Sequence, residues 1–135
     1  MIRTSLLSGS IFAASAVIIG AFGAHGLQAY LQTNEITAVQ LNSYETGVRY
    51  QMYHAFALML TGILGKVFGE SKALKAAMWL FIIGILFFSG SIYFLSTRGI
   101  TGINAGFLGP VTPVGGILFV AGWLCVFVAA VKRRG

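Results

Sequence analysis

The chain has 135 residues, of which 57% are apolar and only 9% are charged, and its mean hydropathy is +0.86. A soluble domain carries about 25% charged residues, so this composition excludes an ordinary water-soluble protein and favours one embedded in lipid. The formal charge of +6 does not indicate nucleic-acid binding, because the basic residues form neither a stripe nor a patch and lie instead at the ends of apolar segments.

Four apolar stretches of 19 to 24 residues follow one another along the chain: Ser5–Ala24, Tyr50–Phe68, Ala73–Ser96 and Pro113–Val131. A helix rises about 1.5 Å per residue and the hydrocarbon core is about 30 Å thick, so each stretch is long enough to span a membrane. We therefore expect an all-α membrane protein, with four transmembrane helices in one bundle and a single integral membrane domain over residues 1–135.

A polar connection, roughly Gly26–Arg49, joins the first span to the second and is longer than most helix–helix connections. Within it, Thr37 and Gln40 have the spacing of a capping box. An apolar helical face follows, made of Leu41, Tyr44 and Val48. This pattern predicts a short amphipathic helix that lies at the outer membrane surface and runs into the second span.

Four ionisable side chains lie near the outer ends of the first two spans. Glu45 and Arg49 are four residues apart, the spacing of a helical ion pair. His25 closes the first span, and His54 lies just inside the second. Ionisable groups at membrane depth often mark functional sites, and two histidines could ligate a haem or a metal ion or pass a proton. Two ligands do not make a zinc site, so a histidine hydrogen-bonded to a neighbouring helix is favoured, and we expect no metal and no cofactor.

The fourth span has a clear start signal. Thr112 occupies an N-cap position and Pro113 the first helical position. Free N–H groups then face outward, and Arg98 precedes them by one short loop. Such a helix end attracts anions, and a lipid phosphate or the Glu45 carboxylate are the expected occupants. The alternative is an ordinary capped start that needs no ligand.

The distribution of Lys and Arg predicts the orientation. With four spans, both termini and the connection between the second and third spans share one side of the membrane. That side carries Arg3, Lys66, Lys72, Lys75, Lys132, Arg133 and Arg134. The other side carries only Arg49 and Arg98. Because short loops rich in Lys and Arg stay cytoplasmic, we predict a multi-pass protein of the bacterial plasma (inner) membrane with both termini in the cytoplasm.

Four motifs resemble those of a known family: Gly20–Leu27, Thr46–His54, Phe88–Tyr93 and Thr112–Gly116. Over nearly its whole length the chain resembles the small bacterial inner-membrane proteins filed as domain of unknown function 423, related to a small mitochondrial membrane protein of animals. The resemblance implies four spans in the plasma membrane and supplies no established activity. The family's signature residues map onto His25, Arg49, Gln51, His54, Ser89, Ser91, Thr112 and Pro113.

On this topology, most of these residues belong to the outer halves of the spans. We therefore expect one polar cluster beneath the outer surface, made of His25, Glu45, Arg49, Gln51, His54, Ser89 and Thr112. No catalytic residue stands out, because the chain shows no acid–base or nucleophile constellation. This favours a noncatalytic protein that binds membrane lipids, a second copy of itself or another membrane protein. The alternatives are a protomer of a small transporter or channel, and haem or metal binding through His25 and His54.

Overall fold

The computed structural model describes residues 1–133, and every regular element among them is a helix or a helical turn. The predicted all-α class is therefore confirmed for this part of the chain. Arg134, one of the basic residues assigned to the cytoplasmic side, lies outside the described residues. In chain order the elements are α1 (Ile2–Ala21), the π turn η1 (Phe22–Gly26), α2 (Leu27–Gln32), α3 (Ala38–Phe68), α4 (Lys72–Ile85), the π turn η2 (Leu86–Gly90), α5 (Ser91–Ser96), α6 (Arg98–Thr101), the 3-10 turn η3 (Gly106–Leu108) and α7 (Val111–Lys132).

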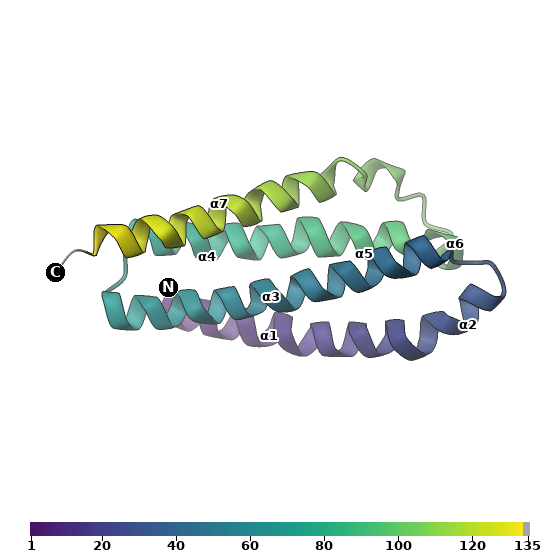
Figure 1. The fold of residues 1–135 in the computed structure, drawn as a ribbon, viewed down its shortest axis with the longest axis horizontal. Helices are drawn as coiled ribbons and strands as arrows, with labels where there is room; N and C mark the ends of the chain where they lie inside the picture. The colour runs from purple at the N-terminus through teal and green to yellow at the C-terminus, as the bar shows by residue number, and fades with distance from the viewer. Residues whose placement is uncertain (134–135) are drawn as a thin grey trace.

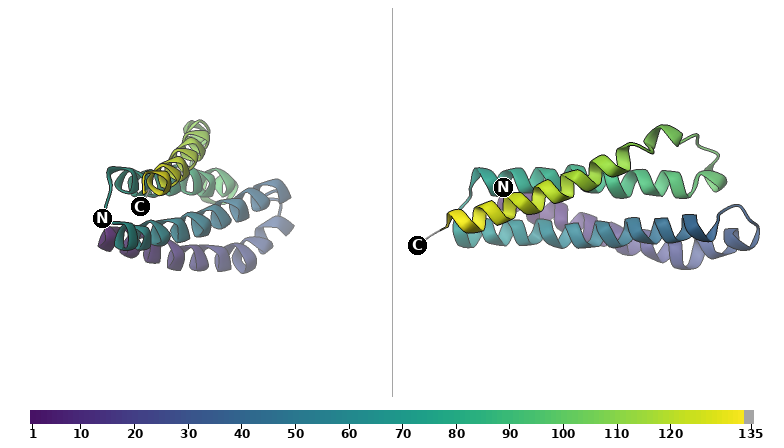
Figure 2. Two further views of the ribbon diagram at one scale, coloured as in Figure 1. Left: turned by 60° about the vertical axis from the view of Figure 1, so that its left-hand side comes forward. Right: turned by 45° about the horizontal axis from the view of Figure 1, so that its top comes forward.

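The long elements form antiparallel rods (Figure 1). The first rod is α1, η1 and α2 in succession, the second is α3, the third is α4, η2 and α5, and the fourth is α7. The first rod packs along α3 and the third along α7, while α3 and α4 join the two pairs, as the further views in Figure 2 also show. Met1, the 69–71 connection and Lys132 lie at one end, named the terminal end. The 33–37 and 97–110 connections lie at the opposite end, named the loop end.

Three of these rods are long and apolar enough to cross a membrane: Ile2–Gln32, Lys72–Ser96 and the segment Gly106–Lys132 that contains α7. They include the predicted first, third and fourth spans. The predicted second span, Tyr50–Phe68, lies within α3, which is long enough but is not among the helices with sufficient mean hydropathy. Length and composition therefore do not confirm the count of four spans.

The connection between the first two rods is much shorter than predicted. The first rod continues to Gln32 and α3 already begins at Ala38, so only residues 33–37 lie outside a helix. The residues expected in a separate outer helix form the first turns of α3. Their apolar face packs into the bundle, where Leu41 is 7% and Tyr44 3% exposed. A separate outer helix is therefore not confirmed.

The capping box at the start of α3 is confirmed. The Gln40 N–H donates to Thr37 Oγ1 at 3.1 Å, and the Thr37 N–H donates to Gln40 Oε1 at 2.9 Å. Two N–H groups that have no acceptor within the helix are satisfied in this way. The start of α3 is consequently held at Ala38, close to the end of α2.

Two apolar clusters fill the bundle. One joins α3, α4 and α7 around Leu58 and Phe81, both fully buried. The other lies toward the loop end, where Leu27 of α2 and Ile36 of the short connection pack against the first turns of α3. Polar side chains of α3 that face inward must therefore find their partners between these clusters.

Candidate functional site

Gln51 of α3 is the centre of a buried hydrogen-bond network that joins three rods. Its Nε2 donates to the Phe12 carbonyl oxygen at 2.9 Å and to Ser15 Oγ at 2.8 Å, both on α1. From α5, the Tyr93 hydroxyl donates to Gln51 Oε1 at 2.7 Å. The Gln51 side chain is 3% exposed, and both of its N–H donors and its oxygen are engaged. Such a satisfied network fixes the register of the helices.

Two other buried hydroxyl groups near this network donate to carbonyl oxygens of neighbouring rods. Tyr44 donates to the Ile19 carbonyl oxygen at 2.7 Å. Ser89 of η2 donates to the Gly47 carbonyl oxygen, also at 2.7 Å. Each bond ties a different rod to α3, so these hydroxyl groups stabilise the bundle.

Thr112 does not act as the predicted N-cap. The helix α7 begins at Val111, and its start has no side-chain cap. The Thr112 hydroxyl lies inside the first turn and shares a hydrogen bond with the Ser91 hydroxyl of α5. The prediction was wrong because the helix starts one residue earlier than Thr112, which turns the hydroxyl toward α5.

His54 of α3 faces α7 and is 5% exposed. Its Nδ1 lies 2.7 Å from the Tyr50 carbonyl oxygen, and Trp123 Nε1–H donates to its Nε2 at 3.2 Å. An indole can only donate, so Nε2 accepts and Nδ1 carries the proton. The imidazole also stacks on Phe119, with 3.4 Å between the ring centroids. Both ring nitrogens are thus engaged by the protein, and neither is open to a haem or a metal ion.

Three of the predicted site residues are exposed: His25, Glu45 and Arg49. The expected Glu45–Arg49 ion pair is wrong. Arg49 Nη2 instead donates to Thr46 Oγ1 at 3.0 Å, and within residues 1–133 no carboxylate lies at ion-pair distance from Arg49. Glu45 and Arg49 line a cavity of about 270 Å³ against the first rod. The predicted residues thus occupy separate neighbourhoods, and a shared function for them stays a prediction.

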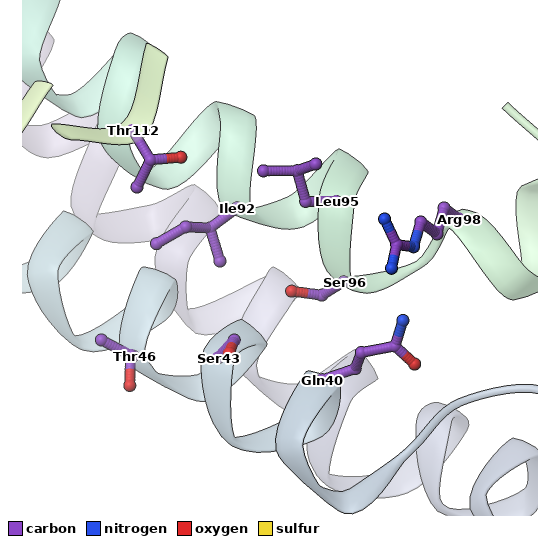
Figure 3. A pocket seen from close by; sticks show the side chains of 8 residues that line it. All are labelled: Gln40, Ser43, Thr46, Ile92, Leu95, Ser96, Arg98 and Thr112. Carbon is purple, nitrogen blue, oxygen red and sulfur yellow. The ribbon is translucent and has the colours of Figure 1, made fainter. Parts of the chain in front are cut away.

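A larger cavity, of about 410 Å³, lies at the loop end between α3, α5 and the start of α7 (Figure 3). Its apolar wall is formed by Ile92 and Leu95 of α5. In Figure 3, Arg98 and Gln40 extend toward each other from opposite sides of the cavity. The remaining lining residues all carry hydroxyl groups: Ser43, Thr46, Ser96 and Thr112.

This loop-end cavity has the chemistry of an anion site beside an apolar wall. Among the described residues, Arg98 is the one charged residue that lines it and offers several N–H donors, and the Gln40 side-chain amide adds a further donor. The Ser43 and Thr46 hydroxyl groups already donate to the Val39 and Asn42 carbonyl oxygens of their own helix. Within residues 1–133 no His, Cys, Asp or Glu lines the cavity, so none of these bases is present to activate its serine and threonine hydroxyl groups. The sequence placed Arg98 near Thr112, but Gln40, Ser43 and Ser96 carried no motif that could have assigned them to the same space.

Comparisons with known proteins identify relatives over nearly the whole chain. Residues 19–116 match the family described as protein of unknown function (DUF423). The chain is 39% identical over 130 residues to the UPF0382 membrane protein YwdK of Bacillus subtilis. The aligned region covers 96% of this chain and 98% of YwdK. It is 36% identical over 133 residues to a UPF0382 membrane protein of Staphylococcus epidermidis, and this alignment covers 98% of the present chain and 99% of the relative. It is 40% identical over 130 residues to a UPF0382 membrane protein of Staphylococcus aureus, with 96% of the present chain and 97% of the relative covered. No solved structure matches the chain.

Proposed function

The chain belongs to the DUF423 family of membrane proteins without an established activity, and on this premise we propose that it is a four-span, noncatalytic plasma-membrane protein. We further propose that it binds an anionic lipid through the loop-end cavity. The observation that carries this proposal is the combination, in one cavity, of the Arg98 guanidinium and the apolar wall of Ile92 and Leu95.

The burial pattern of α3 supports its assignment as the second of four spans. Its 31 residues make a helix about 46 Å long, more than the hydrocarbon core requires. The polar residues that lower its mean hydropathy point into the bundle: Gln51, His54 and Thr61 are at most 5% exposed. The outward face is apolar and 41–58% exposed, and consists of Tyr53, Phe56, Leu60, Ile63 and Val67. Within residues 50–65, lipid would therefore meet only the apolar side of this helix.

The charge difference between the two ends supports a cytoplasmic terminal end. Six described basic residues lie there: Arg3, Lys66, Lys72, Lys75, Lys132 and Arg133. The loop end carries Arg49 and Arg98. Under the positive-inside rule, both chain ends would face the cytoplasm and the loop-end cavity would open at the outer surface of the membrane.

An amphiphile fits the loop-end cavity better than a free metabolite. A volume of about 410 Å³ is of the size that holds a small ligand or a lipid headgroup. Arg98 follows the end of α5, so on the proposed topology it would lie at headgroup depth and meet the phosphate of an anionic lipid. Ile92 and Leu95 lie further toward the membrane interior on α5 and would meet the first methylene groups of the acyl chains.

The alternative functions find less support in the packing. A pathway through a single copy would cross the space between α3, α4 and α7, which is filled by apolar side chains such as Leu58, Met78 and Phe81. The Thr61 hydroxyl at this depth donates back to the Ala57 carbonyl oxygen of its own helix. Haem or metal binding would require a free nitrogen on His54, and both of its nitrogens already have partners.

The substitution Arg98→Gln tests the proposed lipid site. In phosphatidylcholine vesicles doped with phosphatidylglycerol that carries a photoreactive headgroup, wild-type protein should be labelled within residues 92–112. One basic residue near an anionic membrane contributes about 1 kcal/mol, so labelling there should fall about fivefold in the variant. The measurement is the yield of cross-linked peptides by mass spectrometry.

Arg49→Gln is the matched control, because it removes the same charge from the same end but does not line the loop-end cavity. It should retain the labelling of residues 92–112. Equal labelling of the wild-type protein and Arg98→Gln, or equal labelling by a photoreactive phosphatidylcholine, would contradict the proposed lipid specificity. Displacement of the label by inorganic phosphate alone would point to a free anion as the ligand.

A further inference from the structure

The terminal end carries positive charge that the described residues do not neutralise. Among them, Glu70 is the one side-chain carboxylate at this end, and the Met1 amino group already lies 3.4 Å from its Oε1. A surplus of this kind attracts an anionic ligand or surface. The basic side chains concerned are Arg3, Lys66, Lys72, Lys75, Lys132 and Arg133.

A third cavity lies within this charged end, between the last turn of α3, the first turn of α4 and the last turn of α7. It has a volume of about 210 Å³. Lys132, the last residue of α7, and Arg133 directly after it line the cavity on one side, and Ser71 lines it at the start of α4. Its other walls are Phe68, Gly69, Leu74 and Ala129. Two cations therefore share one small space with an apolar wall, and no acidic side chain lines that space.

The contacts around this cavity hold its donors in place. The Arg133 guanidinium carbon lies over the Phe68 ring, 4.1 Å from the ring centroid. This stacking uses the face of the guanidinium group and leaves the N–H groups at its edge available to an anion. On the opposite wall, Ser71 Oγ accepts the Leu74 N–H at 3.2 Å, while the earlier N–H groups of α4 have no acceptor within their own helix. The positive end of the α4 dipole adds to the two cations.

We propose that this terminal-end cavity binds the phosphate group of an anionic phospholipid from the adjoining leaflet. Lys132, Arg133 and the first N–H groups of α4 hold the phosphate. Phe68, Leu74 and Ala129 meet the glycerol and the first methylene groups. The exposed apolar side chains Val67, Val128 and Val131 adjoin the cavity along α3 and α7 and continue the surface toward the acyl chains. This site is independent of the loop-end cavity, from which it is separated by the length of the bundle.

The double substitution Lys132→Gln/Arg133→Gln tests the terminal-end site. The protein is reconstituted in phosphatidylcholine vesicles doped with phosphatidylglycerol bearing a photoreactive headgroup, and cross-links within residues 68–74 and 129–133 are quantified. Loss of two cations should lower this yield roughly 10- to 30-fold. Both side chains are exposed, so the fold should persist, and labelling of residues 92–112 should be unchanged.

Arg3→Gln/Lys66→Gln is the matched control, because it removes the same charge from the same end without altering a residue of the cavity wall. It should retain most of the labelling. Equal loss in both double variants would overturn the proposal in favour of diffuse attraction to the membrane surface. Displacement of the label by inorganic phosphate would overturn the lipid assignment. Ala129→Leu, which fills the cavity at constant charge, should also lower the yield, whereas Arg98→Gln should leave it intact.

Discussion

Gly115→Ala is expected to force α7 away from η2 and to destabilise the protein. A Cβ atom on Gly115 would overlap the backbone nitrogen of Phe88 and lie 2.8 Å from its Cα. Backbone atoms cannot move aside as a flexible side chain can, so the two rods must separate. Overpacking of this kind costs about 1–3 kcal/mol. The measurement is the SDS-induced unfolding of the purified protein in detergent, followed by circular dichroism.

The neighbouring glycine supplies the control. A Cβ on Gly116 would lie 3.9 Å from the nearest ring atoms of Phe88, which is ordinary contact. Gly116→Ala should therefore be tolerated and even raise stability, since alanine in a helix interior is about 0.5–1 kcal/mol more favourable than glycine. Equal stability of the two variants would show that α7 and η2 do not approach as closely as the structure indicates.

The effect of Gly115→Ala should extend to the loop-end cavity. Thr112 lies three residues before Gly115 in α7, and the Thr112 hydroxyl bonds Ser91 where α7 meets α5. Separation of the rods would break this contact and widen the cavity that Arg98 lines. Labelling of residues 92–112 by photoreactive phosphatidylglycerol should therefore fall in Gly115→Ala and persist in Gly116→Ala.

The rods were largely predictable because their signals are local. Long apolar runs predict helices, and the Thr37–Gln40 spacing correctly placed the start of α3. The extension of the first rod to Gln32 was missed, because glycine and polar residues after His25 favour a loop. In the structure Leu27 is fully buried in the cluster that also contains Tyr44, so tertiary packing overrides the local signal.

The partners of the polar residues could not be predicted because they come from distant rods. Helical spacing places Gln51 and His54 on one side of α3, and both are indeed buried. Nothing in the spacing reveals that Gln51 binds Tyr93 of α5 or that His54 binds Trp123 of α7. The Arg49 prediction failed for a local reason, since Arg49 donates to Thr46, three residues earlier on the same helix, instead of pairing with Glu45. The loop-end and terminal-end cavities form between the ends of different rods, and no residue pattern encodes such a space.

Gln51→Leu is expected to be among the most destabilising single substitutions in the bundle. It removes three hydrogen bonds and leaves the half-buried hydroxyl groups of Tyr93 and Ser15 without their glutamine partner. An orphaned buried polar group costs about 1–3 kcal/mol. Gln28→Leu, at an exposed position of α2, should change the free energy of unfolding by at most about 0.5 kcal/mol.

A double-mutant cycle with Tyr93→Phe separates the hydrogen bond from simple loss of packing. Tyr93→Phe alone leaves Gln51 Oε1 without its donor, and should cost about 1 kcal/mol. In the double variant both the Tyr93 hydroxyl and the Gln51 side-chain oxygen are absent, so neither is left without a partner. The loss in the free energy of unfolding should therefore be smaller than the sum of the two single losses by about 0.5–3 kcal/mol. Additive costs would mean that Gln51 and Tyr93 do not interact. In that case Gln51 would join α3 only to α1, and the register between the two pairs of rods would depend on the packing of Ser89 and Gly115 instead.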